Sequence, residues 1–223
     1  FWGTVWMAQG VVLLLLATAF WLAPARAPAA EDRQAGGTLP GLPPLAPTWL
    51  GAGVLVLALV TTLALSGHAM GVESGRPFIV AADALHALTA GTWIGSLVVI
   101  LTAGRAALGQ HGRVGAYAAQ LRSFSPMAVV SVAVLLSMGV VLAWTHLTAV
   151  SDLWTMTYGR VLTAKTGLAG AVLAVGLWNW RRGLPGVDTE LGAGAVQHRA
   201  AVEVSLALGV LLLTAVLVHS PKP

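Results

Sequence analysis

Histidine is the residue type in this chain with the clearest capacity for metal chemistry. The sequence contains six histidines and no cysteine, so thiolate metal sites and disulfides are both excluded. Imidazole suits copper, zinc, iron and nickel, while the thioether of methionine favours Cu(I). Any metal site would therefore depend on imidazole, with carboxylate or methionine as additional ligands. Whether the histidines can meet depends on the elements that carry them.

Long apolar blocks predict that those elements are transmembrane helices. Hydrophobic residues make up 57% of the 223 residues and charged residues 9%, against roughly a quarter charged in soluble domains. About 20 apolar residues span a bilayer, and in hydrocarbon the backbone must satisfy itself as a helix. The sequence therefore predicts an all-α polytopic transmembrane bundle with about six spans. Their expected ranges are Trp2 to Leu22, Thr48 to about Ala69, Val80 to about Ala103, Ser125 to about His146, Tyr158 to Trp180, and Arg199 to about His219.

Proline and glycine positions divide the predicted chain further. The Pro/Gly-rich stretch 23–47 is expected to be a loop between a leading helix, 1–22, and a five-helix domain, 48–223. Because proline suits the first turn of a helix, Pro126 is expected to open the fourth span. Residue 1 is Phe rather than Met, which indicates a fragment or a processed product.

Arginine positions predict the orientation in the membrane. Loops one, three and five carry Arg26, Arg33, Arg105, Arg113, Arg122, Arg181, Arg182 and Arg199, whereas the opposite side carries few basic residues. By the positive-inside rule these loops are cytoplasmic, so both termini are predicted to be extracytoplasmic. The net charge of +4 is then explained by membrane topology, and no nucleic-acid partner is expected.

In this topology four histidines gather at the outer face. At about 1.5 Å rise per residue, His86 lies roughly 7 Å outward of the membrane centre and the other three roughly 15 Å. Asp83 lies i−3 from His86, where it would ligate directly or orient the imidazole. The predicted metal ligands are His68, His86, His146, His219, Met70 and Asp83. His111 and His198 are expected to be solvated loop residues on the cytoplasmic side.

Ordinary structural roles compete with ligation at several of these positions. His146 and His219 are equally well explained as amphipathic residues at a membrane interface, and Met70 as a loop or packing residue. His86 favours function, because ionisable groups inside a membrane are costly and usually functional. Lys165 and Glu203 are charges within spans. Lys165 either pairs with Asp83 or snorkels outward, and Glu203 either marks an inner exit for a cation or pairs with Arg199 at i−4.

Four segments, in order, resemble the membrane domain of the copper resistance D family. They are Asp83-Ala-Leu-His-Ala-Leu-Thr-Ala-Gly-Thr-Trp-Ile-Gly95, Arg122-Ser-Phe-Ser-Pro126, Tyr158-Gly-Arg-Val-Leu-Thr-Ala-Lys165 with the later Asn179, and the closing helix with Glu203. The resemblance covers roughly 66–223. It implies copper uptake or copper tolerance, copper arriving at the outer face, His86 and then His68 as favoured ligands, and a periplasmic copper-binding partner.

Three functions are compatible with these observations. The first is a copper permease, or import component, of a bacterial inner or plasma membrane that takes up copper through the outer histidines. The second is a haem b electron-transfer protein, since membrane cytochromes use paired histidines from facing helices as axial ligands. The third is a copper chaperone for oxidase assembly that does not transport. No nucleophile–base pair, phosphate-binding loop or carboxylate dyad stands out, so no enzymatic activity is expected. The oligomeric state is left open.

Overall fold

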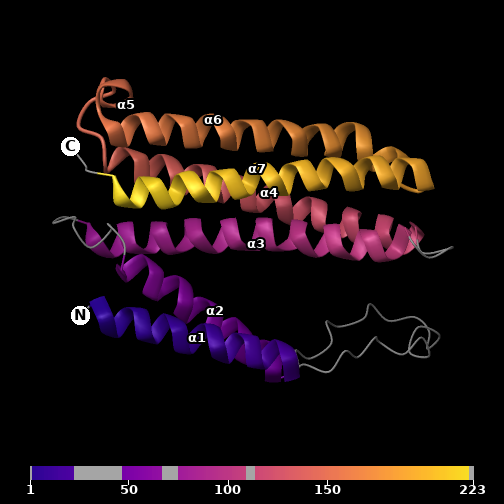
Figure 1. Cartoon of the computed structure of the whole chain (residues 1–223), viewed down its shortest axis with the longest axis horizontal. Helices are drawn as coiled ribbons and strands as arrows, with labels where there is room; N and C mark the ends of the chain where they lie inside the picture. The colour runs from indigo at the N-terminus through magenta and orange to yellow at the C-terminus, as the bar shows by residue number, and fades with distance from the viewer. Residues whose placement is uncertain (1, 23–46, 67–74, 109–113, 221–223) are drawn as a thin grey trace. The chain divides into compact units, whose positions relative to one another are not determined.

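The computed structural model describes residues 2–22, 47–66, 75–108 and 114–220, and these residues are almost entirely helical (Figure 1). In chain order the α-helices are α1 (Trp2–Leu22), α2 (Pro47–Ser66), α3 (Arg76–Leu108), α4 (Val114–Trp144), α5 (Asp152–Thr155), α6 (Thr157–Trp178) and α7 (Glu190–His219). A π-helical turn, η3 (Asn179–Gly183), and a 3-10 turn, η4 (Leu184–Gly186), join α6 to α7. The predicted all-α class is confirmed.

The chain divides into two compact units with a boundary inside α3. Unit 1, Phe1–Ala84, contains α1, α2 and the start of α3. Unit 2, Leu85–Pro223, contains the rest of α3 and all later helices. The expected division into a leading helix, a loop and a five-helix domain stays a prediction, and its loop falls almost wholly outside the described residues.

Four of the described helical segments are long and apolar enough to cross a membrane, fewer than the six predicted. They are Arg76–Thr102, Val114–Trp144, Thr157–Gly186 and Glu190–Val218. The two N-terminal helices form where spans are expected, but their described apolar stretches, Met7–Thr18 and Leu50–Ser66, are shorter. The count of about six is therefore slightly too high by this criterion. The multi-pass membrane class stands.

Helices α4 and α7 both begin about ten residues before their expected starts. Pro126 consequently lies inside α4 rather than in its first turn, which corrects the prediction. The added turns are stabilised by packing, because Tyr117, Ala118 and Leu121 are buried in a cluster that includes Val187 and Val196. Hydropathy alone does not reveal such a cluster, since it lies beyond the continuous apolar block.

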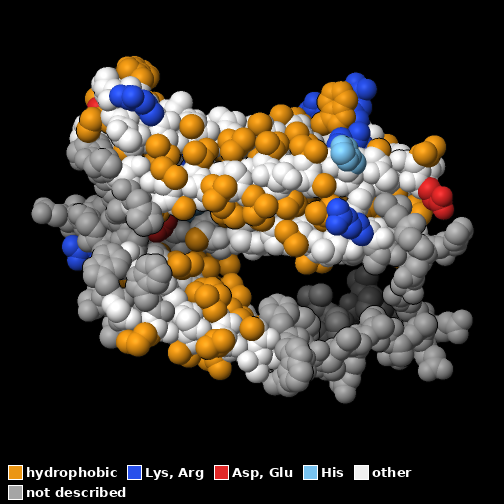
Figure 2. Space-filling view, in the orientation of Figure 1, with side chains coloured by type: hydrophobic (Ala, Val, Ile, Leu, Met, Phe, Trp, Pro, Cys, Tyr) orange, Lys and Arg blue, Asp and Glu red, His pale blue; other side chains and the backbone are white. Residues whose placement is uncertain are grey.

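A second core lies among the long helices of unit 2. Trp93 and Leu97 of α3 and Val172 of α6 are buried there, with partly buried side chains of α4 and α7 around them. Large apolar side chains remain exposed along the outside, including Val130, Val140 and Leu212, each more than 60% exposed. Figure 2 shows hydrophobic side chains spread along the helices of the visible face. Such an exterior is stable in lipid rather than in water.

Candidate functional site

The candidate residues of unit 2 lie at two opposite ends. We call the first the α5 end, where α4 finishes, α6 begins and α7 finishes, and the second the η3 end, where α6 passes through η3 and η4 into α7 (Figure 1). His86 and His146 belong to the half of unit 2 towards the α5 end. His68 and Met70 lie outside the described residues. His219 ends α7, but its side chain also lies outside them.

His86 is anchored on α4 by one ring nitrogen. Its Nδ1 lies 3.0 Å from the carbonyl oxygen of Leu135. Because a carbonyl oxygen has no proton to give, Nδ1 must carry the hydrogen and donate it, and in the neutral form of the ring the lone pair is then on Nε2. Room for the ring comes from Gly139, where a Cβ would stand 3.3 Å from the ring carbon Cε1. The imidazole is therefore fixed in the tautomer that offers Nε2 to a ligand.

His146 shows the same tautomer at the end of α4. Its Nδ1 lies 2.6 Å from the carbonyl oxygen of Leu142 and must donate to it. The ring stacks on Tyr158 of α6, with centroids 5.9 Å apart and planes 17° from parallel. Metal-binding histidines characteristically donate their second ring nitrogen to a carbonyl or carboxylate in this way. Both described histidines of this half thus have Nδ1 held by a backbone carbonyl of α4.

No group of three or more His, Cys, Asp or Glu residues able to hold a metal ion occurs within the described ranges. With the side chains of His68, Met70 and His219 outside those ranges, the six-ligand site stays a prediction. Asp83 and Lys165 each have an interaction partner, so the pair predicted between them is neither confirmed nor refuted. Lys165 acts electrostatically on His86 from α6.

The connection between α4 and α6 is ordered by Asp152. Its Oδ2 accepts hydrogen bonds from the backbone N–H groups of Ala149, at 2.8 Å, and Thr148, at 3.0 Å, and from the Thr148 hydroxyl at 2.8 Å. These bonds lower the pKa of the Asp152 carboxyl, and the bond from the Ala149 N–H has the largest effect. The carboxylate thereby shapes the chain between His146 and Tyr158.

At the η3 end a partly buried chain of polar groups links η3 to α7. Glu203 is only 4% exposed, and its Oε2 accepts a hydrogen bond from Asn179 Nδ2 at 3.0 Å. Asn179 Oδ1 in turn accepts from Arg199 Nε at 2.6 Å. The direct Arg199–Glu203 pair considered from the i−4 spacing is thus replaced by a bridge through Asn179. Asn179 opens the π turn, a type of irregularity frequent at functional sites.

A second buried network at this end joins α3, α4 and α7. The Tyr117 hydroxyl donates to Gln197 Oε1 at 2.9 Å, and Gln197 Nε2 donates to the Leu101 carbonyl at 2.5 Å. Gly104 allows this approach, because a Cβ there would collide with Gln197 and with the Tyr117 ring. Hydropathy gave no sign of the network, since its members lie on three separate helices.

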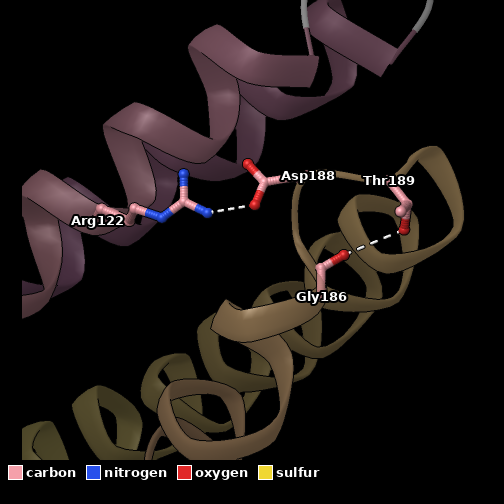
Figure 3. Close-up of polar contacts among 4 residues, drawn as sticks. All are labelled: Arg122, Gly186, Asp188 and Thr189. Carbon is pink, nitrogen blue, oxygen red and sulfur yellow. Dashed lines mark hydrogen bonds and ion pairs between the residues drawn. The ribbon is translucent and has the colours of Figure 1, made fainter.

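An exposed ion pair closes the same end (Figure 3). Arg122 of α4 donates to the Asp188 carboxylate at 2.5 Å, and this hydrogen bond lowers the pKa of Asp188. The neighbouring Thr189 caps α7, its hydroxyl oxygen accepting from the Gly192 N–H at 3.1 Å. The pair ties α4 to the segment that begins α7.

A cavity of about 480 Å³ lies between α3, α4, α6 and α7 in unit 2. Its walls are mostly apolar and include Trp93, Phe124 and Leu136, while Ser125, Asn179 and Glu203 are among its polar lining residues. Glu203 is the one ionisable residue among those described as lining it. The cavity reaches from the Glu203 network to Leu136, the residue after the one whose carbonyl holds His86.

Residues 118–217 match the family model of copper resistance protein D. The resemblance expected from the sequence is therefore confirmed over this part of the chain, which contains His146, Lys165 and Glu203. His86 lies before the matched segment. No curated protein and no solved structure matches the chain significantly.

Proposed function

We propose, from the match to copper resistance protein D over residues 118–217, that this protein takes copper from the extracytoplasmic face of a bacterial inner or plasma membrane. In the proposed orientation the arginine-rich η3 end is cytoplasmic and the α5 end faces outward, as the positive-inside rule requires. Copper enters near His86 and His146, with His68, Met70, Asp83 and His219 as the further candidate ligands. The protein moves or delivers the ion and catalyses no reaction.

The bond from His86 Nδ1 to the Leu135 carbonyl is the observation that carries this proposal. A ligand histidine must be neutral and must direct one lone pair at the metal, and its other nitrogen is almost always held by a second group. Orientation by a backbone carbonyl is cheaper to maintain than orientation by a mobile side chain, because the helix already fixes the carbonyl. The Leu135 carbonyl already holds the second nitrogen of His86 in this way.

Lys165 fits a site that must release its ion. Its ammonium acts electrostatically on His86, and a nearby positive charge weakens the binding of a cation. Conduction requires a site that binds well enough to fill and weakly enough to empty. Lys165 is therefore proposed to limit the residence of copper at His86 rather than to ligate it. A periplasmic copper-binding protein would supply the ion at this face.

The test is metal binding by purified protein under reducing conditions. The variant is His68→Ala/His86→Ala, and the matched control is His198→Ala, which removes an exposed imidazole near the η3 end. The parent and the control are expected to bind copper stoichiometrically, and the double variant to lose at least tenfold in affinity. Equal copper binding by parent and double variant contradicts the proposal. No copper together with a Soret absorption band would support the haem b alternative instead.

Copper flux separates transport from a chaperone role. Protein reconstituted into vesicles with the α5 end outward is expected to accumulate copper, and the double variant to accumulate less. Stoichiometric binding without accumulation would support the non-transporting chaperone for oxidase assembly. Both measurements use the whole chain, so neither depends on isolating one unit.

A further inference from the structure

We propose that Glu203 is a reversible proton-binding site that holds its proton as a neutral carboxylic acid at neutral pH. The site consists of the Glu203 carboxyl, the Asn179 amide and the Arg199 guanidinium at the η3 end of unit 2. Its ligand is a proton rather than copper. Burial, hydrogen-bond direction and the cavity beside the carboxyl each support this assignment.

Burial makes an ionised Glu203 costly. The side chain is 4% exposed within a candidate membrane span, Glu190–Val218. A carboxylate removed from water needs a cation or several hydrogen-bond donors to remain charged. The described contacts give it the Asn179 amide, while the Nε of Arg199 is bonded to Asn179. Protonation removes the charge. The neutral carboxylic acid then loses much less solvation free energy on burial than a carboxylate ion would.

The hydrogen-bond directions favour a proton over a metal cation at this carboxyl group. Because Asn179 Oδ1 accepts from Arg199, the amide is fixed with its NH₂ group turned towards Glu203. A metal ion beside this carboxylate would meet an N–H donor and, one residue further, a guanidinium cation. Cu(I) also prefers thioether and imidazole to hard carboxylate oxygen. A proton binds covalently to one carboxyl oxygen and needs no further ligand.

Two glycines and the π turn shape the site. Glu203 Oε1 lies against Gly176, where a Cβ would stand 2.6 Å from it. At Gly183 a Cβ would stand 3.1 Å from Nη2 of Arg199, so a second glycine admits the guanidinium. The π turn begins at Asn179 and ends at Gly183, and it sets the Asn179 amide between the side chains of Glu203 and Arg199. Three local features of α6 and η3 thus serve one carboxyl group.

The cavity provides the route for exchange. Glu203 and Asn179 both line it, so a water molecule entering the cavity reaches the carboxyl. In the proposed step one proton passes from a hydronium ion in the cavity to Oε1, since Oε2 already accepts from Asn179, leaving a water molecule, and the proton returns to water by the same route. No electron moves and no other bond is made or broken. The charged group joined to this network is Arg199, one helical turn earlier on α7, through its bond to Asn179.

Infrared spectroscopy of copper-free protein in lipid nanodiscs tests the proposal directly. At neutral pH the parent is expected to show the carbonyl stretch of a protonated carboxylic acid, shifted in heavy water and absent in Glu203→Gln. The matched control is Glu190→Gln, an exposed glutamate on the same helix, which should keep the band. If Glu203→Gln does not fold, Glu203→Asp should move the band. A parent without the band, or a band unchanged in these Glu203 variants, overturns the proposal.

Coupling of the proton to copper rests on the function proposed above and has its own test. In vesicles, copper uptake by the parent is expected to fall severalfold when a protonophore collapses the proton gradient. Copper uptake by Glu203→Gln is expected to stay unchanged by the protonophore. Parent uptake that ignores the gradient overturns the coupling. Vesicles that take up no copper at all would contradict the proposed transport while leaving the infrared result standing.

Discussion

The two ends of unit 2 organise polar side chains in different ways. At the α5 end the rings of His86 and His146 donate to backbone carbonyls of α4, so each ring is fixed by a helix through its Nδ1. At the η3 end side chains bond one another across helices, as in Tyr117–Gln197 and Asn179–Glu203. The first arrangement orients single histidine rings, whereas the second joins polar side chains of different helices and so fastens those helices together. Apart from the proton site proposed at Glu203, we therefore expect substitutions at the η3 end to affect stability and those at the α5 end to affect copper binding.

The largest effect is expected from Gly104→Ala at the η3 end. The added methyl group would collide with Tyr117 and Gln197, both almost fully buried, and overpacking of this kind costs about 1–3 kcal/mol. Thermal unfolding in detergent should show a clearly lower Tm with unchanged copper affinity. The control, Gly95→Ala, adds its methyl where nothing lies within 4 Å. Equal Tm values for the two variants would remove the structural role assigned to this network.

A smaller effect, on copper alone, is expected from Gly139→Ala at the α5 end. Its Cβ would stand 3.3 Å from the His86 ring, so the ring must tilt and the bond to Leu135 weakens. Loss of such orienting contacts typically lowers metal affinity about 10–100-fold, and we expect the lower end of that range. Competitive titration with a Cu(I) chelator measures it, and Gly170→Ala, which meets nothing within 4 Å, is the control. An unchanged affinity would argue against His86 as a ligand.

The smallest effect is expected at the exposed Arg122–Asp188 pair. The pKa of Asp188 lies below its ordinary value of 3.8 because Arg122 donates to it. The pair therefore stabilises the fold fully above that ordinary value, and its contribution disappears as the pH falls through the lowered pKa. Asp188→Asn should give a slightly lower Tm at neutral pH and no difference in strong acid or high salt. A Tm difference that persists in acid would show that the carboxylate charge is not the cause.

Much of this architecture can be predicted, because an apolar block in the sequence shows which residues lie within the depth of the membrane. Each of the six expected spans overlaps a described helix, although α4 and α7 begin earlier than expected, and the placement of His86 in α3 needs only a count of residues from its start. The rotation of each helix about its own axis cannot be predicted from hydropathy. The Leu135 carbonyl as partner of His86, and Asn179 between Arg199 and Glu203, depend on which faces of the helices meet. Asn179 stood in a segment with family resemblance, which was the one sequence signal for it.

The early starts of α4 and α7 also depend on tertiary contacts. Their first turns contain polar residues such as Gln120 and Gln197, so an apolar block does not include them. They are helical because Tyr117, Val187 and Val196 bury one another, a contact between segments that lie far apart in the sequence. Local pattern cannot anticipate such burial, and the helix containing Pro126 is accordingly longer than its hydropathy indicates.

X-ray absorption at the copper edge tests the central claim most directly, because it reports the atoms bound to the ion. In the Cu(I)-loaded parent we expect the multiple scattering of imidazole, with nitrogen ligands at about 2.0 Å, as for imidazole bound to zinc. His86→Ala should lose part of this signal, and His198→Ala should retain it. A copper site without imidazole scattering, or one identical in parent and His86→Ala, would contradict the assignment of His86 as the copper ligand at the outer face.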